Sequence, residues 1–424
     1  YGLRKDTFMP LAAHRFSICQ NSLCNLGMER DIAMLVETGI SMFATAASAE
    51  VTIRYLASQG GLNAHELAAE LQALVDAEAS NGGATCLLRV GVPQHDLVLR
   101  RAAGGIAAGD TPAAPDTSFR VASITKTFTA VVITQLAAEG LLHFDDLMAK
   151  HLPPEHLDIV PRLHVLEGTS YGETITVRQL LTHSSGLFDY AMSPSFFGVI
   201  ANDPGKVWTP REMLEGAIVW GTPHFAPGRG YGYAYSDTGY VLLGLIIEHL
   251  DQRPLHVAYR ERILEPLGLS ATYLEGHEPH RGTEMSHPYQ GGFDTSPIHG
   301  TADWAGGGLV SDVDDLATFA SALAAGRLVS GKWLDEMLEW QFRTLDPALH
   351  SPGYLGYGFG VEARNVHGLL LRGHRGHWGA WMHVHPASGL TITGTINQAD
   401  RPPHAIVQDA VAAVLRAGVV EVSS

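Results

Sequence analysis

The order of strand-like and helix-like segments is the feature that most limits what this chain can fold into. An amphipathic helix is predicted over residues 63–79, followed by two runs typical of strands, 85–92 and 97–103. Two more strand-like runs, 378–385 and 390–395, and a last helix over 405–415 lie near the other end. Mainly helical segments separate the two sets. We therefore predict an α/β fold in which strands from both chain ends form one antiparallel sheet, flanked by the terminal helices and interrupted by an inserted all-helical part.

This pattern predicts one domain over residues 61–420, with the mainly helical insertion at about 141–300. Residues 1–60 show no clear period and are predicted to be an N-terminal extension. Their Ala47-Ser48-Ala49 resembles a secretory cleavage site, but Glu37 interrupts the apolar stretch that an export signal needs. An export signal, a family-specific extension and a misplaced start all stay open, and with them a cytoplasmic or a periplasmic location.

Composition narrows the classes of function. The 28 basic and 44 acidic residues give a net charge of −16, so a nucleic-acid partner is not expected. No run of eighteen apolar residues occurs, and we expect no transmembrane segment. The three cysteines (Cys19, Cys24 and Cys86) are too few for a disulfide scaffold and match no zinc pattern.

Ser123-Ile124-Thr125-Lys126 is an S-x-x-K sequence at the predicted start of a helix over 123–139. A spacing of three places both side chains on one helix face, one turn apart. A serine hydroxyl becomes a good nucleophile when a neighbour takes its proton, and a lysine does so when its charge is suppressed. Tyr235-Ser236-Asp237 opens a later apolar helix, and its phenol could share the proton relay.

Taken together, the motifs resemble those of the serine beta-lactamase-like and penicillin-binding superfamily, in its class C, D-aminopeptidase and esterase branch. The resemblance covers about residues 64–415. It rests on S-x-x-K, on Tyr235-Ser236-Asp237, and on four further segments in the family's order: Leu180-Leu181-Thr182-His183-Ser184-Ser185-Gly186-Leu187, Glu265-Pro266-Leu267-Gly268-Leu269, Gly306-Gly307-Gly308-Leu309-Val310-Ser311 and Gly373-His374-Arg375-Gly376. The fold that the resemblance implies, a sheet domain with an inserted helical domain, agrees with the element order.

The resemblance implies a role for each matching residue. Ser123 matches the acylated serine, Lys126 its general base, and Tyr235 the tyrosine of the Y-x-N motif. Asp237 stands where asparagine is commoner, and a carboxylate cannot donate an amide hydrogen bond to a substrate carbonyl. Recognition of typical beta-lactam side chains is therefore in doubt.

An H-x-G sequence occupies the position of the family's K-T-G, and two registers compete. In the preferred register, His374-Arg375-Gly376, His374 faces the cleft, and the backbone N–H groups of Ser123 and His377 form the oxyanion hole. In the alternative, His377-Trp378-Gly379, the second donor is Ala380.

Arg375 is expected to point to the opposite face of the strand from His374. The expected substrate-binding residues are Asp237, Arg375, Gly376 and Trp378. His183 is expected to be structural rather than catalytic.

The predicted function is a serine hydrolase that cleaves small esters or amides, with a carboxylesterase favoured. A D-amino-acid amidase or peptidase, or a weak beta-lactamase, is the first alternative, and a non-catalytic binder of peptides or cell-wall fragments is the second. The chemistry needs only side chains and backbone N–H groups, so we expect no cofactor. No metal is expected either, because His383 and His385 have no suitably spaced carboxylate or cysteine. The oligomeric state stays open.

Overall fold

The structure, a computed structural model, describes residues 64–82, 85–107, 111–228, 232–340 and 352–422. The extension predicted over 1–60 lies outside these ranges. Within them, every helix is too short or too polar to cross a membrane.

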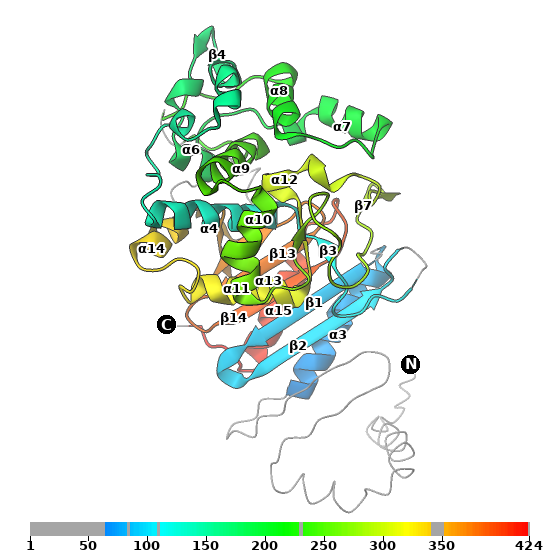
Figure 1. The fold of residues 1–424 in the computed structure, drawn as a ribbon. Coiled ribbons are helices and arrows are strands. Elements are labelled where there is room, and N and C mark those ends of the chain that lie inside the picture. The colour runs from blue at the N-terminus through cyan, green and yellow to red at the C-terminus, as the bar shows by residue number, and fades with distance from the viewer. Residues whose placement is uncertain (1–63, 83–84, 108–110, 229–231, 341–351, 423–424) are drawn as a thin grey trace, which may run out of the picture.

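An antiparallel sheet of seven strands forms the centre of the described chain (Figure 1). Its order is β10-β11-β12-β13-β14-β1-β2, so the two chain ends meet where β14 pairs with β1, with Leu87 opposite Thr395. The strands are β1 (Thr85–Val92), β2 (Leu97–Gly104), β10 (Tyr354–Tyr357), β11 (Glu362–Val366), β12 (Leu369–Arg375), β13 (Ala380–His385) and β14 (Leu390–Thr395). The predicted fold class is confirmed.

The two terminal helices cover one face of this sheet. They are α3 (Ala64–Ser80) and α15 (His404–Arg416), close to the predicted 63–79 and 405–415, and they pack against each other. Leu67, Leu71 and Val75 recur at helical spacing and are buried against the sheet, because only this stripe of α3 is apolar.

The opposite face is covered by α13 (Val313–Ala324), which contacts β1, β13 and β14. Asp312 caps this helix by accepting hydrogen bonds from the N–H groups of Asp314 (2.9 Å) and Asp315 (2.8 Å). The long helix α4 (Thr125–Ala138) belongs to the same core and is buried over nearly its whole length. It contacts α9 (Asp237–Asp251) and α12 (Trp304–Gly307), and these three helices bring the functional motifs together.

Among the described residues of 141–300, the range of the predicted insertion, helices are the main regular structure and loops separate them. In Figure 1, α6, α7 and α8 form the end of the molecule farthest from α3. Thr176 and Gln179 form a capping box at the start of α6. The helices here are α5 (Val160–Leu163), α6 (Val177–Leu181), α7 (Pro194–Asn202), α8 (Pro210–Trp220), α9, α10 (Leu255–Tyr259) and α11 (Glu265–Leu267), and α14 (Lys332–Leu338) follows later. Short strands complete the fold: β3 (Phe119–Arg120), β9 (Leu309–Ser311) and β6 (Tyr273–Leu274) form one sheet, β4 (Val165–Leu166) pairs with β5 (Thr169–Ser170), and β7 (Tyr289–Gln290) pairs with β8 (Phe293–Asp294).

Two predicted element boundaries were wrong, and three strands were missed. The strand predicted over 378–385 begins only at Ala380, because Gly379 donates to the carbonyl of Gly376 (3.1 Å) and closes a tight turn. The strands β10, β11 and β12 were not predicted, since Leu369, Leu370 and Leu371 in a row show no alternation. The helix predicted to begin at residue 123 begins at 125, after a short 3-10 turn.

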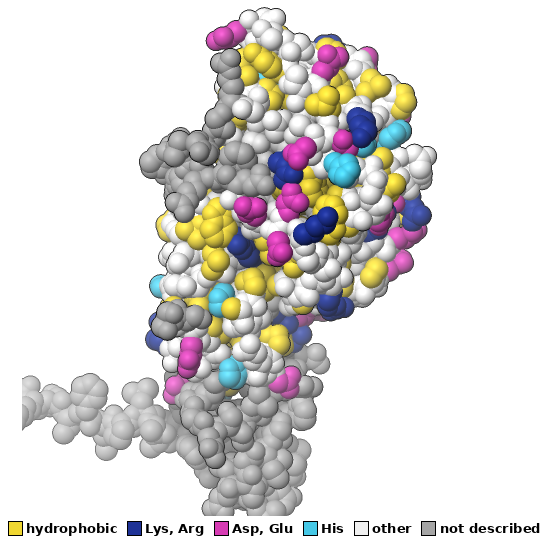
Figure 2. Space-filling view, turned by 90° about the vertical axis from the view of Figure 1, so that its left-hand side faces the viewer, with side chains coloured by type: hydrophobic (Ala, Val, Ile, Leu, Met, Phe, Trp, Pro, Cys, Tyr) yellow, Lys and Arg dark blue, Asp and Glu magenta, His cyan; other side chains and the backbone are white. Residues whose placement is uncertain are grey.

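Figure 2 shows how Lys and Arg side chains are distributed over one face of the molecule. On the face in Figure 2 they lie singly among acidic and neutral side chains rather than in one basic patch. This face therefore offers no obvious track for a phosphate backbone.

Candidate active site

Ser123 lies where the chain turns from β3 into α4. The turn is a single 3-10 turn, η3 (Ala122–Ile124). Ala122 has a φ of +46°, a left-handed value that is uncommon outside glycine and that often accompanies functional sites. The turn leaves the Ser123 side chain half-buried at a cleft and places Lys126 in the first turn of α4.

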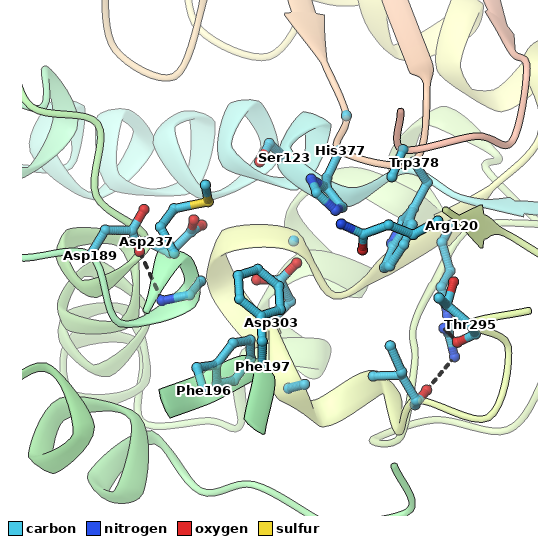
Figure 3. A pocket seen from close by; sticks show the side chains of 18 of the residues that line it. Arg120, Ser123, Asp189, Phe196, Phe197, Asp237, Thr295, Asp303, His377 and Trp378 are labelled. Atoms are coloured by element: carbon cyan, nitrogen blue, oxygen red, sulfur yellow. Dashed lines mark hydrogen bonds between the residues drawn. The ribbon is translucent and has the colours of Figure 1, made fainter. Parts of the chain in front are cut away.

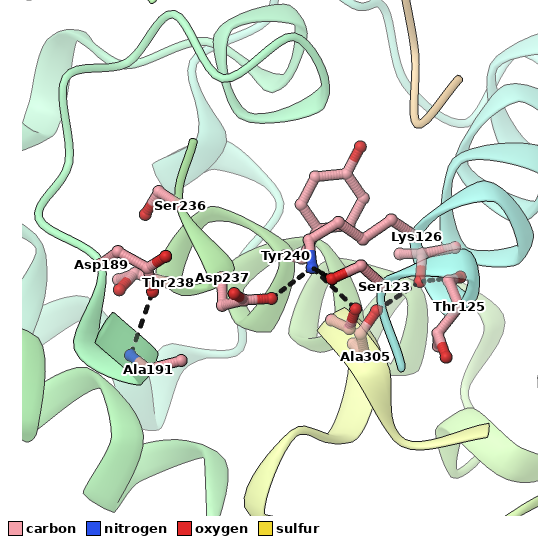
Figure 4. Close-up of polar contacts among 12 residues, drawn as sticks. Ser123, Thr125, Lys126, Asp189, Ala191, Ser236, Asp237, Thr238, Tyr240 and Ala305 are labelled. Carbon is pink, nitrogen blue, oxygen red and sulfur yellow. Dashed lines mark hydrogen bonds and ion pairs between the residues drawn. The ribbon is translucent and has the colours of Figure 1, made fainter. Parts of the chain in front are cut away.

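The amine of Lys126 is fully buried and has three oxygen neighbours (Figure 4). Its Nζ lies 3.0 Å from Ser123 Oγ and 2.8 Å from the carbonyl oxygen of Gly306, and it forms an ion pair with Asp237 Oδ1. An ammonium group would donate to all three oxygens. A neutral amine would donate to Gly306 and Asp237, leaving its lone pair toward the Ser123 hydroxyl. The same three contacts therefore suit both the neutral amine and the ammonium form, between which a general base alternates.

Asp237 is the first residue of α9 and is 7% exposed. Its carboxylate binds Lys126 and packs against Gly306, where an added Cβ would lie 2.5 Å from Asp237 Oδ1. Glycine at 306 therefore makes room for this carboxylate. Because Asp237 is already engaged with Lys126, it differs in chemistry and in availability from an asparagine that binds a substrate amide.

Tyr235 covers the amine of Lys126, whose Nζ lies 4.7 Å from the centre of the phenol ring. Burial raises the pKa of Tyr235 well above its usual value, and the negative charge of Asp237 adds to this rise, so the group is a neutral phenol near pH 7. The nearby Ser123 hydroxyl lowers the pKa of Tyr235, but by less than these two effects raise it. The Tyr235 hydroxyl is buried and forms no hydrogen bond of good geometry within the described residues.

His183 fixes the backbone on both sides of Tyr235. The His183 carbonyl accepts from the N–H of Ala234 (2.9 Å), and the His183 Nδ1 accepts from the N–H of Ser236 (3.1 Å). Nδ1 is therefore unprotonated and Nε2 carries the proton. The sequence interpretation of His183 as structural did not foresee this contact, since 50 residues separate the two segments.

His374 lies near the end of β12 and lines the same cleft as Ser123 and Tyr235. Its Nδ1 donates to the carbonyl of Arg375 (2.7 Å), and its Nε2 accepts from the hydroxyl of Tyr357 (2.8 Å). Burial lowers the pKa of His374 to about 4, against the opposing charge of Glu362, so the imidazole is neutral at pH 7.

The two glycines of the competing H-x-G registers occupy different surroundings. Gly376 packs on the segment that leads to the nucleophile, and a Cβ there would lie 2.2 Å from the carbonyl oxygen of Val121. Gly379 has a φ of +79° and instead packs against the end of β14, where an added Cβ would lie 2.6 Å from Ile396 Cγ1. No carbonyl among the described residues accepts a hydrogen bond from the N–H of His377, which follows Gly376.

Arg375 lines the cleft, but its guanidinium is held by Glu362 in contacts of 3.0 Å from both Nε and Nη2. Arg364 also pairs with Glu362, at 3.0 Å. Two guanidinium groups lower the pKa of the Glu362 carboxyl far below its usual range, although burial works the other way. The guanidinium of Arg375 is thus already bound in an ion-pair network. Gly376 and Trp378, the other expected substrate-binding residues of this segment, line the cleft as well.

The cleft beside Ser123 has a volume of about 1330 Å³ (Figure 3). One side is apolar and includes Phe188, Met192, Phe196, Phe197 and Ile200. Ser123, Tyr235, Asp237, His374, Arg375, Gly376, His377 and Trp378 all line it, and Lys126 lies behind Ser123.

Asp189 and Asp303 also line the cleft, and no sequence motif indicated them. No group of three or more metal-ligating side chains was found in the ranges that the structure describes.

Comparison with known proteins places this site in a family. A family model described as Beta-lactamase matches residues 67–416. The chain belongs to this family. Esterase EstB of Burkholderia gladioli is 30% identical over 240 residues, which are 54% of this chain and 57% of EstB. Protein flp of Staphylococcus aureus (strain MW2) is 30% identical over 160 residues, or 38% of this chain and 28% of flp. The chain thus matches less than two thirds of the length of either relative.

A solved structure of the same family fold covers more of the chain. The D-stereospecific amidohydrolase from Streptomyces sp. is 29% identical with a TM-score of 0.69, and the match covers 81% of this chain and 97% of that one. Both the beta-lactamase family and its fold are therefore established for residues 67–416.

Proposed function

We propose that this chain is a serine hydrolase that cleaves small esters or amides through an acyl-enzyme on Ser123. The observation that carries the proposal is the 3.0 Å contact between Ser123 Oγ and the buried amine of Lys126 at the edge of the cleft. A hydroxyl and an amine at this distance can exchange a proton directly. The esterase and the amidohydrolase among the similar proteins support the same reaction class.

Acylation begins from neutral Lys126. Its lone pair takes the proton of the Ser123 hydroxyl as Oγ attacks the substrate carbonyl carbon. The carbonyl oxygen becomes an oxyanion, which we assign to the N–H groups of Ser123 and His377. The close approach of Gly376 to Val121 supports this assignment, because it brings the turn after β12 against the turn that carries Ser123.

Collapse of the tetrahedral intermediate breaks the bond to the leaving alcohol or amine. Tyr235 gives its proton to the leaving group and recovers one from Lys126, which restores the neutral amine. Water then attacks the acyl-enzyme by the reverse relay and releases the acid and free Ser123. The raised pKa of Tyr235 supports this shuttle role, since a phenol that stays protonated passes protons without accumulating as an anion.

Among substrates, we favour carboxylic esters, which the similarity to EstB supports. The D-stereospecific amidohydrolase supports amides of D-amino acids as the alternative. Beta-lactams are expected to be poor substrates because Asp237 replaces the usual asparagine and is bound to Lys126. A non-catalytic binding role is disfavoured because the contacts of Ser123, Lys126 and Tyr235 suit turnover.

The test combines covalent labelling with a substrate panel. A fluorophosphonate probe should label the wild type at Ser123, and Ser123→Ala should lose both labelling and turnover. The panel contains p-nitrophenyl esters, D- and L-amino-acid amides and a chromogenic cephalosporin. Turnover that survives in Ser123→Ala would place the nucleophile elsewhere, and labelling without turnover of any panel member would favour the binding role.

A further inference from the structure

The cationic side chains around the cleft are already paired with carboxylates. Arg120 binds Glu275 at 2.7 Å, and Lys126 binds Asp237. Arg375 binds Glu362, and Arg401 binds Glu78 at 2.5 Å. Any further carboxylate that lines the cleft therefore adds negative charge that these cations do not balance.

Asp303 is one such carboxylate. It precedes α12, lines the cleft and is half-buried, so a ligand in the cleft can reach it (Figure 3). No described residue forms a hydrogen bond or an ion pair with its side chain. Gly307 gives it space, because a Cβ at that position would lie 2.2 Å from Asp303 Oδ2. Burial and the charge of Asp237 raise the pKa of Asp303 to about 7, and the charges of Lys126 and Arg120 oppose this rise only in part.

Asp189 is a second carboxylate that lines the cleft without a cation bound to it, and it lies on the other side of Asp237. It is 5% exposed and lines the same cleft. Its Oδ1 accepts from the N–H of Ala191 at 3.0 Å, but its Oδ2 is buried without a hydrogen-bond partner. Burial and the charge of Asp237 raise the pKa of Asp189 well above its usual value. Leaving a buried carboxylate oxygen unpaired is costly, and a cation in the cleft would reduce this cost through its charge, because Oδ2 itself is not accessible from the cleft.

We propose that Asp303 forms a subsite for a protonated amine carried by the substrate, and that Asp189, which lines the same cleft, strengthens it through its charge. This inference rests on the proposed hydrolase function and deepens it. An ammonium group is a small cation with several N–H donors, which matches the Asp303 carboxylate, since that carboxylate accepts no hydrogen bond from a described residue. The aromatic residues Phe196 and Phe197 lie beside Asp303 in Figure 3 and provide an apolar wall for the rest of such a substrate. The substrates are therefore esters or amides whose acyl part carries both an amine and an apolar group.

The test uses a matched pair of substrates, phenylalanine methyl ester and N-acetylphenylalanine methyl ester, in both enantiomers. They share the scissile bond, and only the first carries an amine that can take up a proton. The readout is the ratio of their kcat/KM values for the better enantiomer at pH 7. We expect a wild-type ratio of about 10 or more in favour of the free amine, the size of one charge-assisted hydrogen bond. A ratio near 1 or below would overturn the proposal.

Asp303→Asn should lower this ratio by about tenfold, since asparagine keeps the shape but loses the charge. The matched control is Asp294→Asn, because Asp294 also lines the cleft but already binds His287 at 2.7 Å. The control should leave the ratio unchanged. An unchanged ratio in Asp303→Asn, or an equal fall in Asp294→Asn, would overturn the assignment to Asp303.

A binding experiment separates this proposal from the proposed hydrolase function. Calorimetry with 2-phenylethylamine and 2-phenylethanol needs no turnover, and only the amine should bind. Asp189→Asn should weaken that binding, which gives a second variant if Asp303→Asn folds poorly. Binding of the amine by a chain that turns over no ester would uphold the subsite and reject the hydrolase, whereas equal binding of amine and alcohol would reject the subsite alone.

Discussion

The imidazole of His183 lies against the phenol ring of Tyr235, with 4.1 Å between ring centres and 33° between ring planes. His183 also adopts a φ of +55°, a backbone conformation that costs free energy for any residue except glycine. This ring contact, together with the hydrogen bonds to the residues on either side of Tyr235, makes His183 a positioning residue for the proposed proton shuttle.

Replacing His183 tests this role. His183→Leu removes the acceptor for the N–H of Ser236 and is strained at positive φ, so we expect kcat to fall at least tenfold with little change in KM. His183→Asn should be milder, because asparagine tolerates this φ and offers an oxygen acceptor. Steady-state kinetics and thermal unfolding of both variants provide the measurement. Equal kcat values for wild type and His183→Leu would contradict a positioning role.

Tyr235→Phe should separate chemistry from stability. The variant removes only a buried hydroxyl without a hydrogen-bond partner, so the free energy of unfolding should hardly change. Turnover should fall by about 10²-fold or more, the usual contribution of a positioned proton-transfer group. Urea unfolding and ester hydrolysis on one preparation measure both effects. Retention of most activity would assign the shuttle to another group.

Lys126 and Asp237 should show strong coupling in stability. Lys126→Met leaves the carboxylate of Asp237 buried without its partner, which costs about 3–5 kcal/mol in comparable cases. Adding Asp237→Asn removes that charge, so the double variant should recover much of the lost stability while remaining inactive. Urea midpoints of the two single variants and the double variant measure the coupling. A double variant as unstable as Lys126→Met would argue against the ion pair.

His374 and His377 decide between the two H-x-G registers. His374→Ala removes the cleft-facing imidazole that Tyr357 and the Arg375 carbonyl hold, so turnover should fall strongly. His377→Ala keeps the backbone N–H and should act mildly. Kinetics of both variants on one good ester are compared. A larger loss at His377 would transfer the motif to His377-Trp378-Gly379.

His383 should make the fold sensitive to acid. It is 1% exposed, and burial lowers the pKa of its imidazole to about 3, with the positive charge of Arg364 adding to the effect. An unfolded histidine takes up a proton below about pH 6.5 and the buried one does not, so its contribution to stability is complete above pH 6.5 and is lost as the pH falls.

Between pH 7 and 4.5 this loss amounts to about 2–3 kcal/mol for one histidine. His383→Leu should therefore lose less stability over that range than the wild type does, as measured by urea unfolding at both pH values. Other groups that titrate in this range cancel in the comparison of the two proteins. Parallel losses in the two proteins would show that His383 is protonated in the folded state.

The local pattern of apolar and polar residues was sufficient to predict the bounds of several helices and strands. The strands β1 and β14 were predicted with their observed bounds, and α3 and α15 to within one residue at each end, because one buried face imposes a period of two or of 3.6 on the sequence. The spacing of Ser123 and Lys126 predicted their contact for a similar reason: neighbours one helical turn apart meet whatever the rest of the fold does. The order of the motifs indicated the family.

Only the tertiary structure decided which distant groups share the cleft. Three relationships bring together segments that lie from 50 to more than 100 residues apart. They are the contact of His183 with Tyr235, the ion pair of Asp237 with Lys126, and the position of the Asp189 and Asp303 carboxylates in one cleft. The strand β12 could not be predicted because its run of leucines does not alternate with polar residues. The turn at 376–379 could not be predicted either, because it is closed by a backbone hydrogen bond between two glycines. Such relationships depend on the packing of whole helices and strands, and that packing leaves no period in the sequence.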